Sequence, residues 1–262
     1  MAEVLASDGT RLHVEIDGAG EPVTVLAHGL TNSCKELSAF TPMAPGTKVR
    51  FCFRGHGHSG TPEVGHYRFA DFAGDVDAVA RAYGATRAVG TSLGQGAITR
   101  LLSEDPDRFE RLVFILPAAL DVPLSETEVA GFERTADLLE TLPTDDAIEE
   151  ILRGSGRASE YEDRPWLRDV DMLLWQDLQP LGVARALREV TLDVAIADRE
   201  LLRRVNAPTL VIAREGDPIH PAELGRVLSE LIPNSELIML GSEEELYRAI
   251  PELVDRVARF LG

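Results

Sequence analysis

Short, almost wholly apolar runs alternate with amphipathic segments along most of this chain, and this alternation limits the folds open to it. The apolar runs lie at residues 22–29, 47–55, 87–92, 111–119, 207–216 and 235–240. Such runs are typical of strands buried on both faces of a parallel sheet. Segments with helical spacing of apolar residues lie at 69–84, 93–106, 221–232 and 243–262. The pattern predicts an α/β fold with a mostly parallel, doubly wound sheet.

Residues 121–205 interrupt this alternation with helical patterns and no convincing strand. An insertion between two central strands should lie at the carboxyl ends of the strands, where open α/β sheets bind ligands. We therefore expect a helical cap at 121–205 on a core formed by 1–120 and 206–262. The cap offers an apolar and aromatic surface that suits either ordinary packing or an apolar ligand, formed by Trp166, Leu167, Met172, Leu173, Leu174 and Trp175.

Charge and composition restrict the partners of this 262-residue chain, whose formal net charge is −18. A protein with this negative charge repels nucleic-acid phosphates and anionic lipids. Neither nucleic acid nor a membrane is therefore expected as a partner. No apolar run approaches the roughly 20 residues of a membrane span, and the N-terminal residues do not resemble a signal peptide. Two cysteines do not make a disulfide framework. We expect a cytoplasmic protein with a small-molecule partner, and the sequence leaves its oligomeric state open.

A serine lies between two glycines at the end of the third internal apolar run, in Gly90-Thr91-Ser92-Leu93-Gly94. A strand is expected before this Gly-x-Ser-x-Gly pattern and a helix after it. Glycines on both sides let strand and helix approach closely while the serine takes a strained backbone conformation. Ser92 is therefore the candidate nucleophile.

Further motifs in the same order make the chain resemble the α/β-hydrolase superfamily over essentially its full length. His28-Gly29-Leu30 resembles the oxyanion loop, and Arg54-Gly55-His56-Gly57-His58-Ser59 resembles the superfamily's Arg-Gly-x-Gly-x-Ser loop. The run "PTLVIAREGDPIHP" resembles the strand and turn that carry the triad acid. The resemblance implies an α/β-hydrolase fold with a helical cap.

The resemblance also implies roles for individual residues. Ser92 would attack a carbonyl carbon, the backbone amides of Leu30 and Leu93 would form the oxyanion hole, and Asp217 would orient a base. Each oxyanion donor of this kind is typically worth about 3 kcal/mol. The expected activity is hydrolysis of a small carboxylic ester or related acyl substrate. No cofactor and no metal are expected, because the chain has neither a Gly-x-Gly-x-x-Gly turn after the first strand nor a histidine pair at helical metal-binding spacing.

The chain departs from the family where the catalytic histidine is expected. Relatives carry a Gly-His turn after the last strand, whereas this chain reads Gly241-Ser242-Glu243-Glu244, and residues 221–262 contain no histidine. The histidine position falls on or near Glu244. The standard triad is therefore incomplete in the sequence.

Three hypotheses for the missing base stay open. His220 lies three residues after Asp217 and would act as the base from the same loop. Glu244 would act as a base if it faced Asp217, because two close carboxylates raise one pKa; alternatively it only opens the last helix behind a Ser242 cap. In the third hypothesis Ser92 does not turn over, and the protein is a non-hydrolytic or non-catalytic small-molecule-binding member of the fold.

Overall fold

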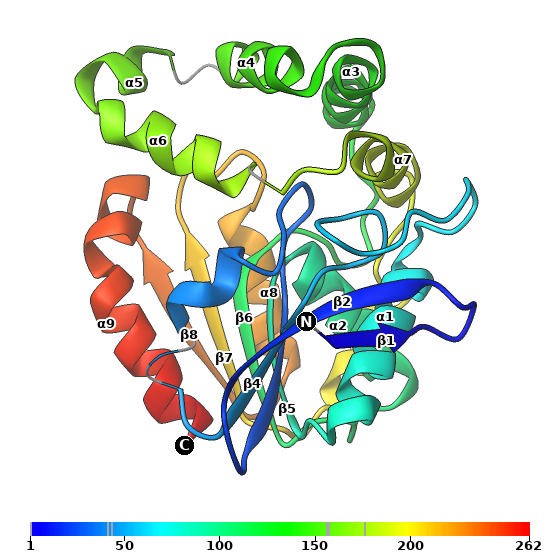
Figure 1. The fold of residues 1–262 in the computed structure, drawn as a ribbon. Coiled ribbons are helices and arrows are strands. Elements are labelled where there is room, and N and C mark those ends of the chain that lie inside the picture. The colour runs from blue at the N-terminus through cyan, green and yellow to red at the C-terminus, as the bar shows by residue number, and fades with distance from the viewer. Residues whose placement is uncertain (1, 41, 43, 156–157, 176) are drawn as a thin grey trace.

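The computed structural model describes the chain except for residues 1, 41, 43, 156–157 and 176, and its centre is an eight-stranded sheet (Figure 1). The strand order is β1-β2-β4-β3-β5-β6-β7-β8. β2 runs antiparallel to both of its neighbours, and all other neighbouring strands are parallel. The strands are β1 (Ala2–Leu5), β2 (Arg11–Gly18), β3 (Val23–Ala27), β4 (Thr47–Phe51), β5 (Arg87–Ser92), β6 (Arg111–Pro117), β7 (Thr209–Arg214) and β8 (Ser235–Leu240). The expected α/β class and doubly wound sheet are confirmed.

Helices cover both faces of the sheet, and each face has its own apolar core. On one face lie α1 (Phe69–Tyr83), α2 (Leu93–Glu104) and α8 (Ala222–Leu231). On the other lie α9 (Glu243–Leu261) and the short 3-10 helix η1 (Glu36–Phe40), which contact each other. Every residue of β3 is buried, as the apolar run at 22–29 predicts for a strand between two helical layers.

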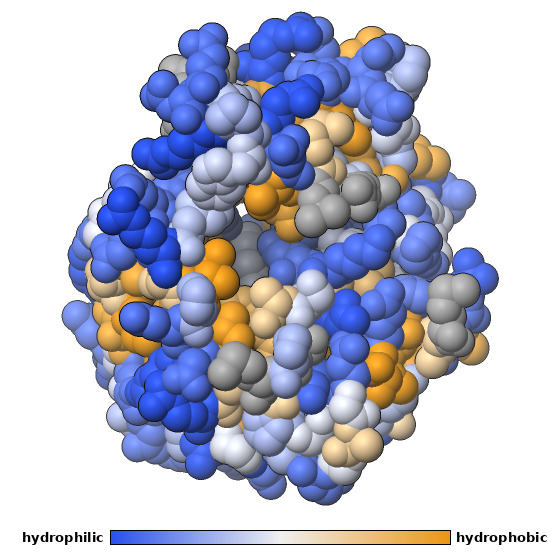
Figure 2. Space-filling model, turned by 60° about the vertical axis from the view of Figure 1, so that its left-hand side comes forward, coloured by the Kyte–Doolittle hydropathy of each residue, from blue (hydrophilic) through white to orange (hydrophobic). Residues whose placement is uncertain are grey.

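The insertion between β6 and β7 forms a layer of helices above the carboxyl ends of the strands (Figure 1). Its α-helices are α3 (Glu126–Thr141), α4 (Thr144–Gly154), α5 (Ala158–Asp163), α6 (Pro165–Leu174) and α7 (Pro180–Val190). α3 and α7 pack on each other through a third apolar cluster. Figure 2 shows apolar residues gathered around a hollow between this layer and the sheet body, within a mostly hydrophilic surface.

The last part of the insertion packs with the sheet body. The segment 198–205, expected as a helix, forms the 3-10 helix η2 (Arg199–Arg204), which contacts α2 and α8. Ile196 and Leu202 are buried in the same core as α1 and α2. Residues that the sequence assigned to the cap, up to 205, therefore pack in the core of the sheet body. The cap boundaries at 121 and 205 stay a prediction. Within the described residues, the structure has no helix that is both long and apolar enough to cross a membrane.

Candidate active site

Ser92 occupies a strained turn between β5 and α2. Its backbone has φ 50° and ψ −110°, a region that residues with a Cβ rarely adopt. The flanking glycines are needed for space. A Cβ on Gly90 would lie 2.7 Å from the Gly94 carbonyl oxygen, and one on Gly94 would lie 2.2 Å from the Ala27 carbonyl oxygen. The Gly-x-Ser-x-Gly pattern therefore holds the serine at the carboxyl edge of the sheet and at the N-terminus of α2.

The backbone amides of Leu30 and Leu93 are the expected oxyanion-hole donors, and the turn at Ser92 is joined to the loop that carries Leu30. The amide of Gly94 donates to the His28 carbonyl at 3.1 Å, which joins the turn to the loop after β3. In the described part of the chain, no hydrogen bond is recorded for the amides of Leu30 and Leu93. These are the two amides to which the sequence assigned the oxyanion hole.

Glu36 is a site residue that sequence reasoning missed. Its Oε2 accepts a hydrogen bond from the Gly29 amide at 2.6 Å, and its Oε1 accepts one from Asn32 Nδ2 at 2.6 Å. A Cβ placed on Gly29 would lie 3.3 Å from Glu36 Oε1 and 3.4 Å from Ser92 Cβ. The carboxyl group and the nucleophile therefore lie against the same glycine. Burial raises the pKa of Glu36 to about 7, against the opposing effect of these two hydrogen bonds.

Two buried histidines shape the surrounding loops. His28 donates from Nδ1 to the Gly29 carbonyl at 2.7 Å, and its Nε2 accepts from the Phe53 amide at 3.0 Å. Burial, together with the neighbouring His56, lowers the pKa of His28 to about 3. His56 is buried as well, and burial lowers its pKa to about 4. Both rings are neutral near pH 7, and His56, like His28, hydrogen bonds to the loop backbone, with its Nδ1 2.8 Å from the Arg54 carbonyl oxygen.

Asp217 and His220 form an acid–imidazole pair in the loop after β7. Oδ2 of Asp217 lies 3.1 Å from His220 Nδ1 and 2.6 Å from Arg214 Nη2, and Oδ1 accepts the amides of Ile219 and His220 at 3.0 Å. Burial raises the pKa of Asp217, but the hydrogen bond and charge of His220 and these two amides outweigh it and hold the pKa well below its usual range. Because an ionised carboxylate only accepts hydrogen bonds, Nδ1 of His220 is the donor in this pair, and in a neutral ring Nε2 would then have the lone pair.

The nucleophile and this pair lie at the same edge of the sheet, but no hydrogen bond joins them. β6 lies between β5, which ends at Ser92, and β7, which precedes Asp217, so these two strands are about 10 Å apart. An imidazole between them would span much of that gap. Among the described residues, however, neither Ser92 Oγ nor His220 Nε2 is recorded with a hydrogen-bond partner. The structure therefore assembles the acid with the imidazole and leaves the serine apart from both.

Glu244 has cationic partners. It lies in the first turn of α9, where Ser242 Oγ accepts the Glu245 amide at 3.1 Å and caps the helix. Its carboxylate forms ion pairs with Arg248 and, at 3.7 Å, with Arg164, which directly precedes helix α6. No contact with Asp217 is recorded within the described residues. The capping interpretation of this segment is confirmed, and among the described residues Glu244 pairs with arginines rather than with Asp217.

A pocket of about 420 Å³ lies where α6 of the insertion meets α9. It is lined by Arg164, Trp166, Glu244, Tyr247 and Arg248. The Trp166 and Tyr247 rings meet edge to face with centroids 5.3 Å apart. Leu167 is fully buried, so this part of the apolar surface expected over the site is packing. The side chain of Leu173 lies outside the described residues.

Comparison with known proteins agrees with this fold. The family model described as "alpha/beta hydrolase fold" matches residues 25–246. Among solved structures, an enol-lactonase from Burkholderia xenovorans LB400 is 22% identical with a TM-score of 0.81, covering 99% of both chains. A hydrolase from Pseudomonas aeruginosa PA01 is 27% identical with a TM-score of 0.77, covering 100% of this chain and 98% of the other. The bottromycin epimerase BotH is 19% identical with a TM-score of 0.74, and the match covers 100% of this chain and 99% of the epimerase chain. With a family match over most of its length, this chain belongs to the alpha/beta hydrolase family.

Proposed function

We propose that this protein hydrolyses a small carboxylic ester or lactone through Ser92, with His220 as the base and Asp217 as the group that orients it. The observation that carries the proposal is the hydrogen bond between His220 Nδ1 and Asp217, which leaves Nε2 as a proton acceptor at the edge of the sheet where Ser92 lies. A carboxylate holding one ring nitrogen while the other accepts a proton is the arrangement of serine hydrolases.

The reaction needs four events at named atoms. His220 Nε2 removes the proton from Ser92 Oγ while Oγ attacks the carbonyl carbon. The amides of Leu30 and Leu93 hold the oxygen that becomes negative. The protonated imidazole then gives its proton to the leaving alcohol oxygen, and an acyl-enzyme remains. Water, activated by the same nitrogen, hydrolyses the acyl-enzyme and regenerates Ser92.

The proton transfer requires Nε2 and Oγ to come within about 3 Å of each other. Asp217 and His220 are held together by contacts within one loop. The whole loop would therefore have to move toward Ser92. Substrate binding under the helices above the site would drive this approach. Free protein and acylated protein should therefore differ in the position of residues 215–221.

The substrate class follows from the site and its neighbours. A cap of apolar character over a serine suits a small acyl group with little charge. The enol-lactonase similarity adds lactones, which are cyclic esters, to the candidates. Glu36 lies close to Ser92, against the same glycine. At a pH above its pKa of about 7, its carboxylate should favour neutral or cationic esters over anionic ones.

A second candidate function is non-hydrolytic chemistry on the same fold. Two observations favour it: Ser92 is not hydrogen bonded to an imidazole in the described residues, and one similar structure is that of an epimerase. In this alternative, a polar group of the site would move a proton on a bound small molecule, and Ser92 would form no acyl-enzyme.

A hydrolysis panel separates the two functions. We would measure release of p-nitrophenol from acetyl, butyryl and benzoyl esters, and ring opening of five- and six-membered lactones, with wild type and with Ser92→Ala. Hydrolysis that Ser92→Ala lowers by about 1000-fold or more supports the proposal. Activity that is absent, or equal in wild type and Ser92→Ala, overturns it and favours the alternative.

A further inference from the structure

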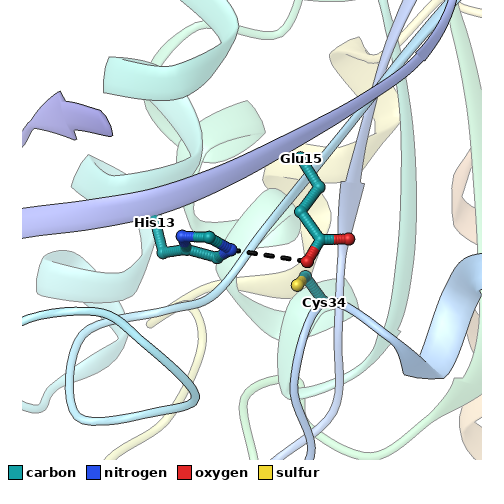
Figure 3. A group of neighbouring side chains, drawn as sticks. All are labelled: His13, Glu15 and Cys34. Atoms are coloured by element: carbon teal, nitrogen blue, oxygen red, sulfur yellow. Dashed lines mark hydrogen bonds and ion pairs between the residues drawn. The ribbon is translucent and has the colours of Figure 1, made fainter. Parts of the chain in front are cut away.

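Three potential metal ligands meet on β2 and the segment that follows the oxyanion loop (Figure 3). They are a ring nitrogen of His13, a carboxylate oxygen of Glu15 and Sγ of Cys34, and these three atoms lie within 4.8 Å of one another. His13 and Glu15 alternate with Leu12 and Val14, which enter the core, so their side chains share the other face of β2. Cys34 reaches the same place from the loop before η1.

The distances suit a small transition-metal ion. Zinc binds nitrogen and carboxylate oxygen at about 2.0–2.2 Å and thiolate sulfur at about 2.3 Å, which puts tetrahedral ligands roughly 3.3–3.8 Å apart. His13 Nε2 and Glu15 Oε1 are 3.4 Å apart, within that range. The sulfur has to move by no more than about 1 Å to complete a three-ligand face.

The charges around the cluster also leave room for a cation. Arg50 pairs with Glu15 through Oε2 at 3.0 Å and with Asp17 at 2.8 Å, so one guanidinium is shared by two carboxylates. Its bonds leave Oε1 of Glu15 facing His13 and Cys34. A Cys34 thiolate would add another negative charge, and a divalent cation would balance the group. The contact of Arg50 with Oε2 would hold Glu15 in its ligating orientation.

The cluster is buried but reachable. His13 and Cys34 are 4% and 3% exposed, whereas the side chain of Glu15 is 32% exposed. An ion can therefore enter past Glu15 and keep one water in its fourth position. Cys52 lies outside the three-ligand group, but its sulfur accepts a hydrogen bond from the Cys34 amide at 3.4 Å and its side chain also hydrogen bonds to the Cys34 thiol. A metal ion would have to displace this thiol contact in order to bind Cys34.

We propose that His13, Glu15 and Cys34 form a binding site for a divalent, thiol-seeking transition-metal ion, zinc foremost. The ion would join β2 to the segment that carries Glu36, and so would fasten the loop beside Ser92 to the sheet. No step of the proposed hydrolysis passes through it. Because the ion displaces the thiol proton, binding should weaken as pH falls.

Cobalt(II) titration of the full-length protein, in a reducing buffer without chelators, tests this site. We expect one equivalent to bind with a thiolate-to-cobalt charge-transfer band, and zinc to displace it. Cys34→Ser should abolish the band, and Glu15→Gln should weaken binding by about 10-fold or more. Zinc should also raise the thermal unfolding temperature of wild type and leave that of Cys34→Ser unchanged.

Cys52→Ser is the matched control, since it removes the neighbouring thiol and leaves the three ligands in place. A band that persists in Cys34→Ser, or one that is lost only in Cys52→Ser, overturns the assignment. Absence of any thiolate band in wild type overturns it as well. If Cys34→Ser does not fold, the surface variant Glu15→Gln decides, because unchanged cobalt affinity in that variant contradicts the site.

Discussion

Nδ1 of His220 lies 3.1 Å from Oδ2 of Asp217, and both residues belong to one short loop after β7. In family members with the usual motif, the histidine follows the last strand instead. Here the position after β8 opens helix α9 with three glutamates behind a serine cap. In this chain, the carboxylate–imidazole pair lies entirely within the loop after β7.

Substituting His220 and Glu244 in turn should show which of the two residues is the base. His220→Ala should lower acylation of Ser92 by about 1000-fold or more, because no other imidazole is held by Asp217. Glu244→Gln should change it less than about 2-fold, since this glutamate pairs with Arg248 and Arg164 at the surface. Stopped-flow measurement of the acylation rate with a p-nitrophenyl ester compares the two. A large loss in Glu244→Gln alone would reverse the assignment.

Two glycine-to-alanine substitutions, at Gly94 and at Gly74, should have opposite effects on the free energy of unfolding. Gly94→Ala puts a methyl group 2.2 Å from the Ala27 carbonyl oxygen, so it should cost about 3 kcal/mol or more of unfolding free energy. Gly74→Ala in helix α1 has no neighbour within 4 Å of the new Cβ and should add about 0.5–1 kcal/mol. Urea unfolding of both variants measures the difference. Equal stabilities would refute the close approach at the turn.

Glu36 should make stability depend on pH. Burial raises its pKa from 4.5 to about 7 in the folded protein, so the folded state keeps a proton that the unfolded state loses between these values. Its contribution to stability is therefore present below about pH 4.5 and declines as pH rises to about 7, by about 1–3 kcal/mol. Relative to Glu36→Gln, wild type should lose that amount between pH 5 and pH 8 in urea unfolding. A constant difference would contradict the raised pKa.

The sequence predicts those features that are formed by residues near one another in the chain. The apolar runs predict the strands because a parallel sheet buries both faces, and the turn around Ser92 follows from the glycines that its geometry requires. The pairing of His220 with Asp217 is also local, because only two residues lie between them. Segment 198–205 has helical spacing yet winds as a 3-10 helix against α2 and α8, because tertiary packing decides so short a piece.

Contacts between residues that are far apart in the chain could not be predicted from the sequence. Glu36 lies against the same glycine as Ser92 only because the loop after β3 folds back toward the end of β5. His13 and Glu15 meet Cys34 only once β2 has paired with β4, and neither contact leaves a motif in the sequence. Periodicity reports which face of an element is buried, but not which side chains meet across elements.

Labelling with a serine-reactive fluorophosphonate tests the central claim most directly, because the probe reports an activated serine without knowledge of the substrate. Wild type should be labelled once, Ser92→Ala should not be labelled, and His220→Ala should be labelled about 1000-fold more slowly. The peptide carrying the adduct, identified by mass spectrometry, should contain Ser92. A wild-type protein that stays unlabelled, or that is labelled as fast without His220, would contradict this account.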